Sequence, residues 1–248
     1  VRPFVEQRPE ETFERLYALC DHESPHVRRW CSEGCRPRLP WGKKLHALVA
    51  DPTPIWPILE ALRDDPELYV RRSVANNLND ITKDHGEAVI ARCQQWMRPQ
   101  RRKAPPEGRQ WIVRHALRSL IKDGDPGALA VVGFGPPEKI DATLGVAPGR
   151  IAIGEKVELR ATLSSRAKGS QKLAVDYAVH YVRKGDKRSA KVFKWKVLEL
   201  AGGAEETLTK RHPMRVTTIR ALYPGPHRVE LQVNGQRLAE ASFDLDPA

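Results

Sequence analysis

The chain has 248 residues, which is enough for one large domain or two ordinary ones, each with an apolar core. Its 42 Lys and Arg residues against 31 Asp and Glu residues give a formal net charge of +11, which favours a polyanionic partner such as DNA, RNA or an anionic membrane surface. No apolar run approaches the ~18 residues that a membrane-spanning helix needs and no signal peptide opens the sequence, so we do not expect membrane insertion.

The cysteines and the first residue carry further expectations. All four cysteines lie in the first half of the chain, which does not suit a disulfide framework and indicates a reducing, cytoplasmic compartment. The sequence opens on Val1 rather than Met, which predicts an N-terminally incomplete first domain. The ligand types of a zinc site are present, but their spacing matches no standard finger, so we expect no metal and no other cofactor; they are Cys20, His22, His26, Cys31 and Cys35.

The two halves of the chain differ in hydrophobic pattern. Up to about residue 135, apolar residues recur at the spacing of amphipathic helices, as in 13–20, 55–62 and 113–121. A Pro-rich basic stretch at 98–107 predicts a connection without regular structure. From residue 136 on, short alternating runs predict strands, and Asn234-Gly235 predicts a type I′ hairpin turn. We therefore expect an α-helical domain at 1–135 and an antiparallel β-sandwich at 136–248.

The helical half contains an internal repeat. Val27-Arg28-Arg29, Val70-Arg71-Arg72 and Val113-Arg114-His115 follow one another at an interval of 43 residues. Helix pairs that repeat every ~40–47 residues are typical of HEAT and armadillo solenoids, in which equivalent positions of successive repeats stack. The predicted fold class is a HEAT-like α-α solenoid followed by a β-sandwich.

A helical projection of the second helix of each repeat separates a core face from a polar face. The core face is expected to carry Val27, Cys31, Gly34 and Cys35; Val70, Val74 and Leu78; and Val113, Leu117 and Ile121. The polar face is expected to carry Arg29, Glu33 and Arg36; Arg72, Asn76 and Asn79, with Asp80 at its edge; and His115, Ser119 and Lys122. This face is either an ordinary solvated surface with ion pairs or a surface that follows DNA phosphates.

Glu33 and Asp80 are carboxylates within this mostly basic face. They would weaken DNA binding unless they stabilise a developing positive charge, and hydrolysis of an N-glycosidic bond creates one because its transition state resembles an oxocarbenium ion. A cationic alkylated base leaves without protonation, so a carboxylate has only to stabilise the sugar cation or position a water. We predict catalytic roles for both acids.

Between the first two repeats lies the segment RPRLPWGKK, residues 36–44. Two prolines restrict it, four basic residues surround it, and Trp41 lies near its centre. The indole either packs under a helix end, as many tryptophans do, or is presented for stacking on a sugar or base. The basic neighbours favour the second interpretation.

Two of these segments together resemble the AlkC branch of the AlkC/AlkD DNA glycosylases: WCSEGCRPRLPW at 30–41 and YVRRSVANNLNDITKDH at 69–85. The C-terminal half resembles the immunoglobulin-like extension of some AlkC members. The resemblance implies a bacterial, monofunctional, metal-free HEAT-repeat enzyme that excises cationic N3-alkylated bases from duplex DNA and leaves an abasic site. It implies 3-methyladenine as the chief substrate and 3-methylcytosine as a second candidate. It also implies that Glu33 and Asp80 lie at the lesion and that Trp41 packs against the deoxyribose.

On this hypothesis the partner is duplex DNA containing alkylated bases, and the protein is a cytoplasmic monomer that reaches the nucleoid through DNA and has no membrane partner. The expected DNA-binding residues are Arg29, Arg36, Arg38, Lys43, Arg72, Asn76 and Lys122. The alternative is a non-enzymatic HEAT-repeat scaffold that binds nucleic acid or an acidic protein, because a fold does not by itself establish a function.

Overall fold

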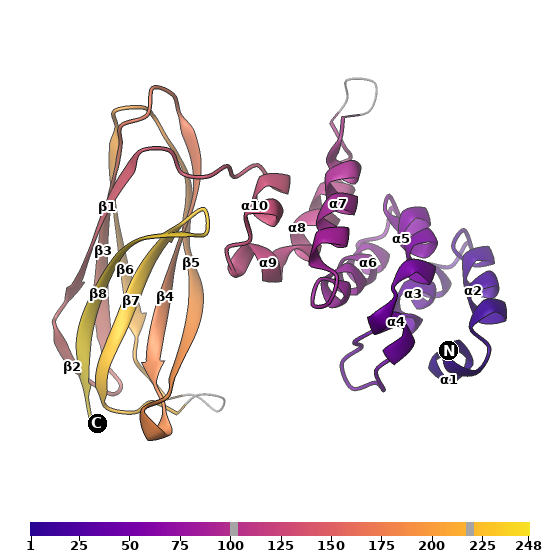
Figure 1. Cartoon of the computed structure of the whole chain (residues 1–248), viewed down its shortest axis with the longest axis horizontal. Coiled ribbons are helices and arrows are strands. Elements are labelled where there is room, and N and C mark those ends of the chain that lie inside the picture. The colour runs from indigo at the N-terminus through magenta and orange to yellow at the C-terminus, as the bar shows by residue number, and fades with distance from the viewer. Residues whose placement is uncertain (100–103, 217–220) are drawn as a thin grey trace. The chain divides into compact units, whose positions relative to one another are not determined.

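The computed structural model describes residues 1–99, 104–216 and 221–248 (Figure 1). The chain forms two compact units, Val1–Ile121 and Lys122–Ala248, the first helical and the second rich in strands. Residues 100–103 of the irregular connection predicted at 98–107 lie outside the described residues. Within the described ranges, no helix is both long and apolar enough to cross a bilayer.

The first unit consists of short helices joined by tight connections. In chain order they are α1 (Arg2–Gln7), α2 (Pro9–Ala18), α3 (Pro25–Gly34), α4 (His46–Ala50), the 3-10 turn η1 (Thr53–Ile55), α5 (Trp56–Leu62), α6 (Leu68–Ile81), α7 (Gly86–Met97), α8 (Glu107–Ala116) and α9 (Arg118–Lys122). Pro9 and Pro25 are the first residues of α2 and α3. Proline suits that position because its fixed φ is already helical and the first turn needs no backbone donor.

The three predicted repeat helices correspond to α3, α6 and α8, and α6 contacts both of the others. Val70, Val74 and Leu78 of α6 have no exposed surface, as the projection predicts. Buried side-chain amides join the helices: Asn77 Nδ2 donates to the backbone oxygen of Ser32 (2.9 Å), and Asn79 Nδ2 donates to that of Ala116 (2.8 Å). Both buried amide nitrogens therefore have a partner in the neighbouring helix.

The third repeat helix differs from the prediction. It begins at Glu107, before the Val113 motif, and ends at Ala116 rather than continuing to Lys122. Leu117 (φ −83°, ψ 2°) separates it from α9, although its side chain remains buried as predicted. The uninterrupted apolar spacing across this junction gave no sign of the break, because Leu117 fills the same core position in a helix or in a turn.

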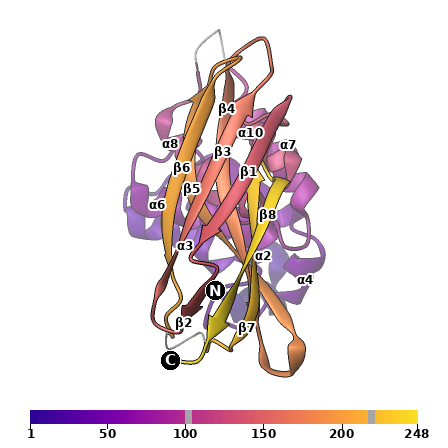
Figure 2. The same cartoon turned by 90° about the vertical axis from the view of Figure 1, so that its left-hand side faces the viewer.

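The second unit begins with α10 (Pro126–Val131) and continues as two sheets. Its strands are β1 (Ile140–Ala147), β2 (Arg150–Ala152), β3 (Lys156–Ser165), β4 (Gln171–Val182), β5 (Arg188–Leu200), β6 (Glu205–Pro213), β7 (Gly225–Val233) and β8 (Gln236–Asp246), with the 3-10 turn η2 (Lys184–Asp186) before β5. One sheet has the order β1-β3-β6, which Figure 2 shows side by side, and the other has the order β2-β8-β7-β4-β5. The pairs are antiparallel, as predicted, except that β2 runs parallel to β8.

The apolar sides of the two sheets form the core of the sandwich. Val157 and Leu159 of β3 pack in the same cluster as Tyr177 and Val179 of β4. Burial alternates along β3, which is the pattern of a strand with one face on a core. The predicted type I′ turn is confirmed, since Asn234 (φ 45°) and Gly235 (φ 79°) both have positive φ and join β7 to β8.

The compact units divide between Ile121 and Lys122, earlier than the predicted division at 135/136. The segment from Lys122 to residue 139 packs with the sheets. Gly124 and Gly235 approach so closely that a Cβ on Gly235 would lie 2.5 Å from the Gly124 oxygen. Asn234 Nδ2 also donates to the Gly135 oxygen (2.7 Å). The helical spacing of residues 122–135 gives no sign of this docking, because these contacts involve backbone atoms.

Candidate active site

Glu33 lies in the last turn of α3, and both of its carboxylate oxygens accept hydrogen bonds. Oε1 accepts from Arg36 Nη1 at 2.7 Å. Oε2 accepts from Ser73 Oγ at 2.7 Å and from Arg29 Nη2 at 3.3 Å. Arg29 and Glu33 are four residues apart and therefore lie on one face of the helix. Because Ser73 belongs to α6, these bonds tie the acid to both helices.

Asp80 lies near the end of α6 and is only 4% exposed. Its Oδ2 accepts from Arg36 Nε at 2.8 Å, and Lys83 Nζ lies 4.0 Å from its Oδ1. One guanidinium therefore bridges the two predicted catalytic acids. Burial lowers the pKa of Arg36, but its bonds with Asp80 and Glu33 outweigh burial and leave that pKa raised. We call Arg29, Glu33, Arg36, Ser73 and Asp80 the acid cluster.

Trp41 is 107% exposed, so its indole does not pack under a helix end. Its backbone is left-handed (φ 63°), a conformation that costs a non-glycine residue roughly 1–2 kcal/mol. A fully exposed indole on a strained backbone contributes nothing evident to folding, and such strain is typical of functional sites. The exposed indole rules out the first interpretation of the loop, and presentation of Trp41 to a sugar or base stays a prediction.

The loop that carries Trp41 is anchored on both sides of its tip. Arg2 of α1 donates from Nη1 to the Arg36 oxygen (2.7 Å) and from Nη2 to the Lys43 oxygen. The Leu45 backbone nitrogen donates to the Pro37 oxygen (3.1 Å). These bonds fix the base of the loop while Trp41 remains free of intramolecular contacts that would cover it.

Three residues that the projection places on the polar face or at its edge are buried: Arg36, Asn79 and Asp80. Arg36 is 7% exposed and lies beyond the end of α3, where it pairs with acids instead of facing solvent. Asn79 is also buried and bonds to Ala116 and Ser119 of the third repeat. The projection assumed that α3 continues to Arg36, and it could not include the helix that covers Asn79.

The other predicted DNA-binding residues differ in their environment. Arg38 makes a two-fold ion pair with Asp84, with both bonds at 2.7 Å, and exposed Lys43 pairs with Glu6 at 3.0 Å. Arg29 Nη1 donates to the backbone oxygen of Tyr69 (2.9 Å), and its guanidinium lies 4.3 Å from the centre of the Tyr69 ring. Exposed Arg72, half-buried Asn76 and exposed Lys122 complete the set, and Lys122 is the first residue of the second unit.

Sequence reasoning missed Ser73, Tyr69 and Arg118. Ser73 resembles an ordinary small core residue until its place opposite Glu33 is known. Arg118 follows the unpredicted helix break and donates from Nη2 to Asn76 Oδ1 (3.1 Å). The repeat interval of 43 residues is the sequence signal that could have identified these partners. Glu33 and Ser73 are 40 residues apart and Asn76 and Arg118 are 42 apart, so each pair joins nearly equivalent positions of successive repeats.

The four cysteines are free and buried, and Cys31 and Cys35 lie in the core as the projection predicts. Cys31 and Cys35 have no exposed surface, and burial raises the pKa of the Cys35 thiol to about 12. In the parts of the chain that the structure describes, no group of three or more His, Cys, Asp or Glu side chains is arranged to hold a metal.

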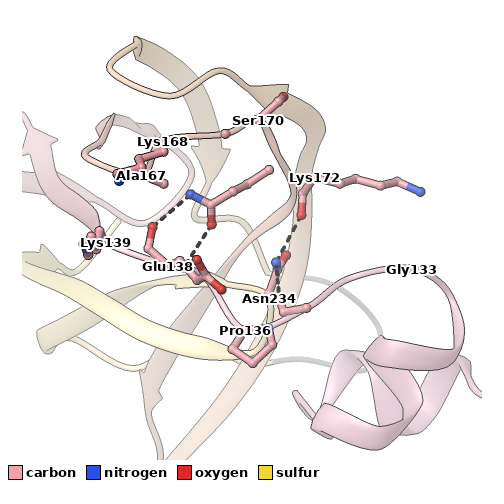
Figure 3. Close-up of a pocket in the computed structure, with 12 residues that line it drawn as sticks. Gly133, Pro136, Glu138, Lys139, Ala167, Lys168, Ser170, Lys172 and Asn234 are labelled. Carbon is pink, nitrogen blue, oxygen red and sulfur yellow. Dashed lines mark hydrogen bonds between the residues drawn. The ribbon is translucent and has the colours of Figure 1, made fainter.

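A pocket of about 480 Å³ lies in the second unit (Figure 3). Its polar groups form hydrogen bonds with one another: the Gln171 side-chain amide accepts from the backbone nitrogen of Glu138 (2.8 Å) and donates to the backbone oxygen of Glu138 (2.9 Å). Asn234 donates to the Lys172 oxygen at 3.1 Å. These bonds attach the segment before β1 to the sheet, and none of the predicted site residues lines the pocket.

The chain is similar to known proteins along almost its whole length. Residues 141–247 match the family described as "Uncharacterised protein YhaZ, C-terminal Ig-like domain", so the β-sandwich is immunoglobulin-like. Over 246 residues, which are 99% of this chain and 67% of the relative, the chain is 39% identical to "Uncharacterized protein YhaZ" of Bacillus subtilis. The structure of the Pseudomonas fluorescens alkylpurine DNA glycosylase AlkC, bound to DNA containing an abasic site analog, is similar at a TM-score of 0.90 and 42% identity, covering 99% of this chain and 67% of that chain.

Proposed function

Because the chain belongs to the AlkC family, we propose that it is a DNA repair glycosylase that hydrolyses the N-glycosidic bond of cationic alkylated bases in duplex DNA and leaves an abasic site. The observation that carries this proposal is the acid cluster, which holds both predicted catalytic acids on one guanidinium, together with the similarity to a glycosylase bound to abasic DNA. 3-Methyladenine is the proposed chief substrate, and 3-methylcytosine is a second candidate.

The proposed DNA-binding element is a HEAT-like solenoid. Successive repeats would pair α2 with α3, α5 with α6 and α7 with α8, and the 43-residue interval and the contacts of α6 with α3 and α8 support this arrangement. Repeat proteins bind ligands along the surface formed by equivalent positions. Exposed cations on this unit would then neutralise phosphates and fix the register of the duplex, while the acids act at one sugar.

The chemistry proposed for the acids is electrostatic. As the bond from C1′ to the base nitrogen breaks, its electron pair leaves with the cationic base, which departs neutral, and positive charge develops on the sugar. A carboxylate held in a water-poor site stabilises that charge more strongly than it would in bulk water. Water then adds to C1′ and loses its proton to Asp80, Glu33 or solvent, which completes a monofunctional hydrolysis without a covalent enzyme intermediate.

Trp41 is proposed to pack against the deoxyribose at the lesion. Its exposure makes a large apolar surface available, and the anchored base of the loop reduces the backbone ordering that binding requires. We also propose a monomer that acts on DNA in the bacterial cytoplasm; the bacterial sources of both relatives support the bacterial origin.

The test is release of free 3-methyladenine from methylated duplex DNA by the chain and by Glu33→Gln, Asp80→Asn and Trp41→Ala, with the Pseudomonas fluorescens AlkC as positive control. We expect release by the parent, loss in both acid variants with DNA affinity retained, and a greater loss for Asp80→Asn than for Trp41→Ala. The same assay on 3-methylcytosine decides the second substrate. Salt-sensitive DNA binding without release would favour the scaffold alternative.

A further inference from the structure

The two acids of the cluster differ in how many of their lone pairs are occupied. Glu33 accepts three hydrogen bonds, from Arg36, Ser73 and Arg29. Asp80 accepts one bond at Oδ2, whereas no hydrogen bond from the described residues reaches its Oδ1, whose nearest cation is Lys83 at 4.0 Å. The Asp80 side chain keeps 6% exposure, and Oδ1 is its oxygen without a hydrogen bond from the described residues.

We propose that Arg36 and Ser73 are positioning residues that hold Glu33 and Asp80 as one unit, in which Asp80 Oδ1 faces the substrate and Glu33 acts through Arg36. This inference rests on the proposed function and deepens it by assigning different roles to the two acids. It also removes Arg36 from the set of phosphate-binding residues, because its guanidinium is already occupied inside the protein.

The geometry of Arg36 explains why an arginine is required. Its Nε bonds to Asp80 and its Nη1 bonds to Glu33, so the planar fork fixes the distance and angle between the carboxylates. A lysine ammonium is a compact charge on a flexible stem and cannot impose that orientation. A charge-conserving Arg36→Lys change would therefore keep the electrostatic balance and lose the alignment.

Ser73 fixes the other side of the same unit. It lies within α6 and has no exposed surface, so its hydroxyl is held in place by the helix. By donating to Glu33 Oε2 at 2.7 Å it locks the rotamer in which Oε1 meets Arg36. Ser73 thus acts on Asp80 through two intermediates, Glu33 and Arg36, and touches no substrate itself.

The experiment measures single-turnover release of 3-methyladenine and, separately, affinity for two duplexes that cannot react. One duplex carries a positively charged pyrrolidine at the lesion position and the other a neutral tetrahydrofuran. The ratio of their dissociation constants reports the negative potential at the sugar without turnover, since a cationic mimic resembles the transition state. The variants are Ser73→Ala, Ser73→Thr and Arg36→Lys, each in the parent and in the Glu33→Gln background.

We expect Ser73→Ala and Arg36→Lys to lower the rate constant by on the order of 10- to 100-fold, as small misplacements of reacting groups do. In these variants the preference for the cationic duplex should fall, while affinity for the neutral duplex should not change. Ser73→Thr, which keeps the hydroxyl, should have a smaller effect on the rate constant than Ser73→Ala. In the Glu33→Gln background Ser73→Ala should add little, because its route to Asp80 is already broken. Arg92→Lys, which alters a pair with Glu60 outside the cluster, is the matched control.

The outcomes distinguish a failure of the positioning roles from a failure of the proposed function. If the parent releases the base and prefers the cationic duplex but Ser73→Ala and Arg36→Lys leave both unchanged, the positioning roles are wrong and the proposed function stands. A fully additive loss of Ser73→Ala and Glu33→Gln would likewise show that Ser73 does not act through Glu33. A parent with neither release nor preference would overturn the proposed function and this inference with it.

Discussion

Arg36 and Asp80 form a buried ion pair although they are 44 residues apart in the sequence, with Nε 2.8 Å from Oδ2. Their side chains are 8% and 6% exposed, so both charges have largely left water. Removing a charge from water costs several kcal/mol, which the mutual attraction and the further bond to Glu33 must offset. The pair therefore makes the position of the loop after α3 depend on the end of α6, and it makes Arg36 essential to the charge balance of both acids.

We expect Arg36→Met to lower the free energy of unfolding by about 3–5 kcal/mol, because two acids lose their shared counter-charge while one of them stays buried. Urea titration followed by circular dichroism measures this. Arg38→Met is the matched control: Arg38 and Asp84 are each 25% exposed, and loss of a solvent-screened pair should destabilise the fold much less than loss of Arg36. Equal losses for the two variants would mean that Arg36 is not held in a low-dielectric site.

The repeat helices were predictable because their signal is local. An apolar residue every three or four positions, repeated at a fixed interval, predicts α3, α6 and α8 and the burial of Val74 and Leu78. The Asn234-Gly235 turn was predictable for the same reason, since only residues that tolerate positive φ suit it. The break at Leu117 and the docking of residues 122–135 onto the sheets were not, because backbone contacts made across the fold decide them.

The candidate site was predictable only in part. Carboxylates in a basic segment identify Glu33 and Asp80 as candidates, and a lone Trp in a basic loop identifies Trp41. The role of Arg36 depends on where the chain turns after Gly34 and on a helix 44 residues away, so the projection assigned it to solvent. Ser73 has no local signal, because a buried serine in a helix looks the same whether or not it donates to an acid.

Replacement of Trp41 should lower activity without lowering stability. Asn tolerates the left-handed backbone and exposes no large apolar ring, so Trp41→Asn should leave the free energy of unfolding unchanged or raise it by up to ~1 kcal/mol. Release of 3-methyladenine should nevertheless fall. As a control, Trp96 is 2% exposed, and Trp96→Ala should cost about 3–5 kcal/mol. Clear destabilisation by Trp41→Asn would show that the indole has a structural role.

Arg72, like Lys122, is a predicted DNA-binding residue that is exposed and makes no ion pair with the described residues. If it neutralises one phosphate, Arg72→Gln should reduce the slope of log K against log salt by about 0.9. The measurement is a binding titration on one duplex at several salt concentrations. Arg92→Gln is the control, because Arg92 is already paired with Glu60 and should leave the slope unchanged. An unchanged slope for Arg72→Gln would remove Arg72 from the interface.

Asp64 and Arg109 give the first unit a predictable dependence on pH. Arg109 Nε donates to Asp64 Oδ1 at 2.8 Å, and this bond, opposed by partial burial, lowers the pKa of the Asp64 carboxyl. A carboxyl whose pKa is lower in the folded than in the unfolded state stabilises the fold above its unfolded pKa of about 3.9. That stabilisation is lost as the pH falls through the folded pKa.

Asp64→Asn should therefore destabilise the chain at neutral pH, and its effect should shrink steadily below pH ~4 as the parent carboxyl is protonated. Urea unfolding of both chains across this range measures the difference, with Asp21→Asn, at an exposed acid that makes no ion pair with the described residues, as a control that should show none. A difference between Asp64→Asn and the parent that persists unchanged into strong acid would contradict the assigned role of the ion pair and point to packing of the side chain instead.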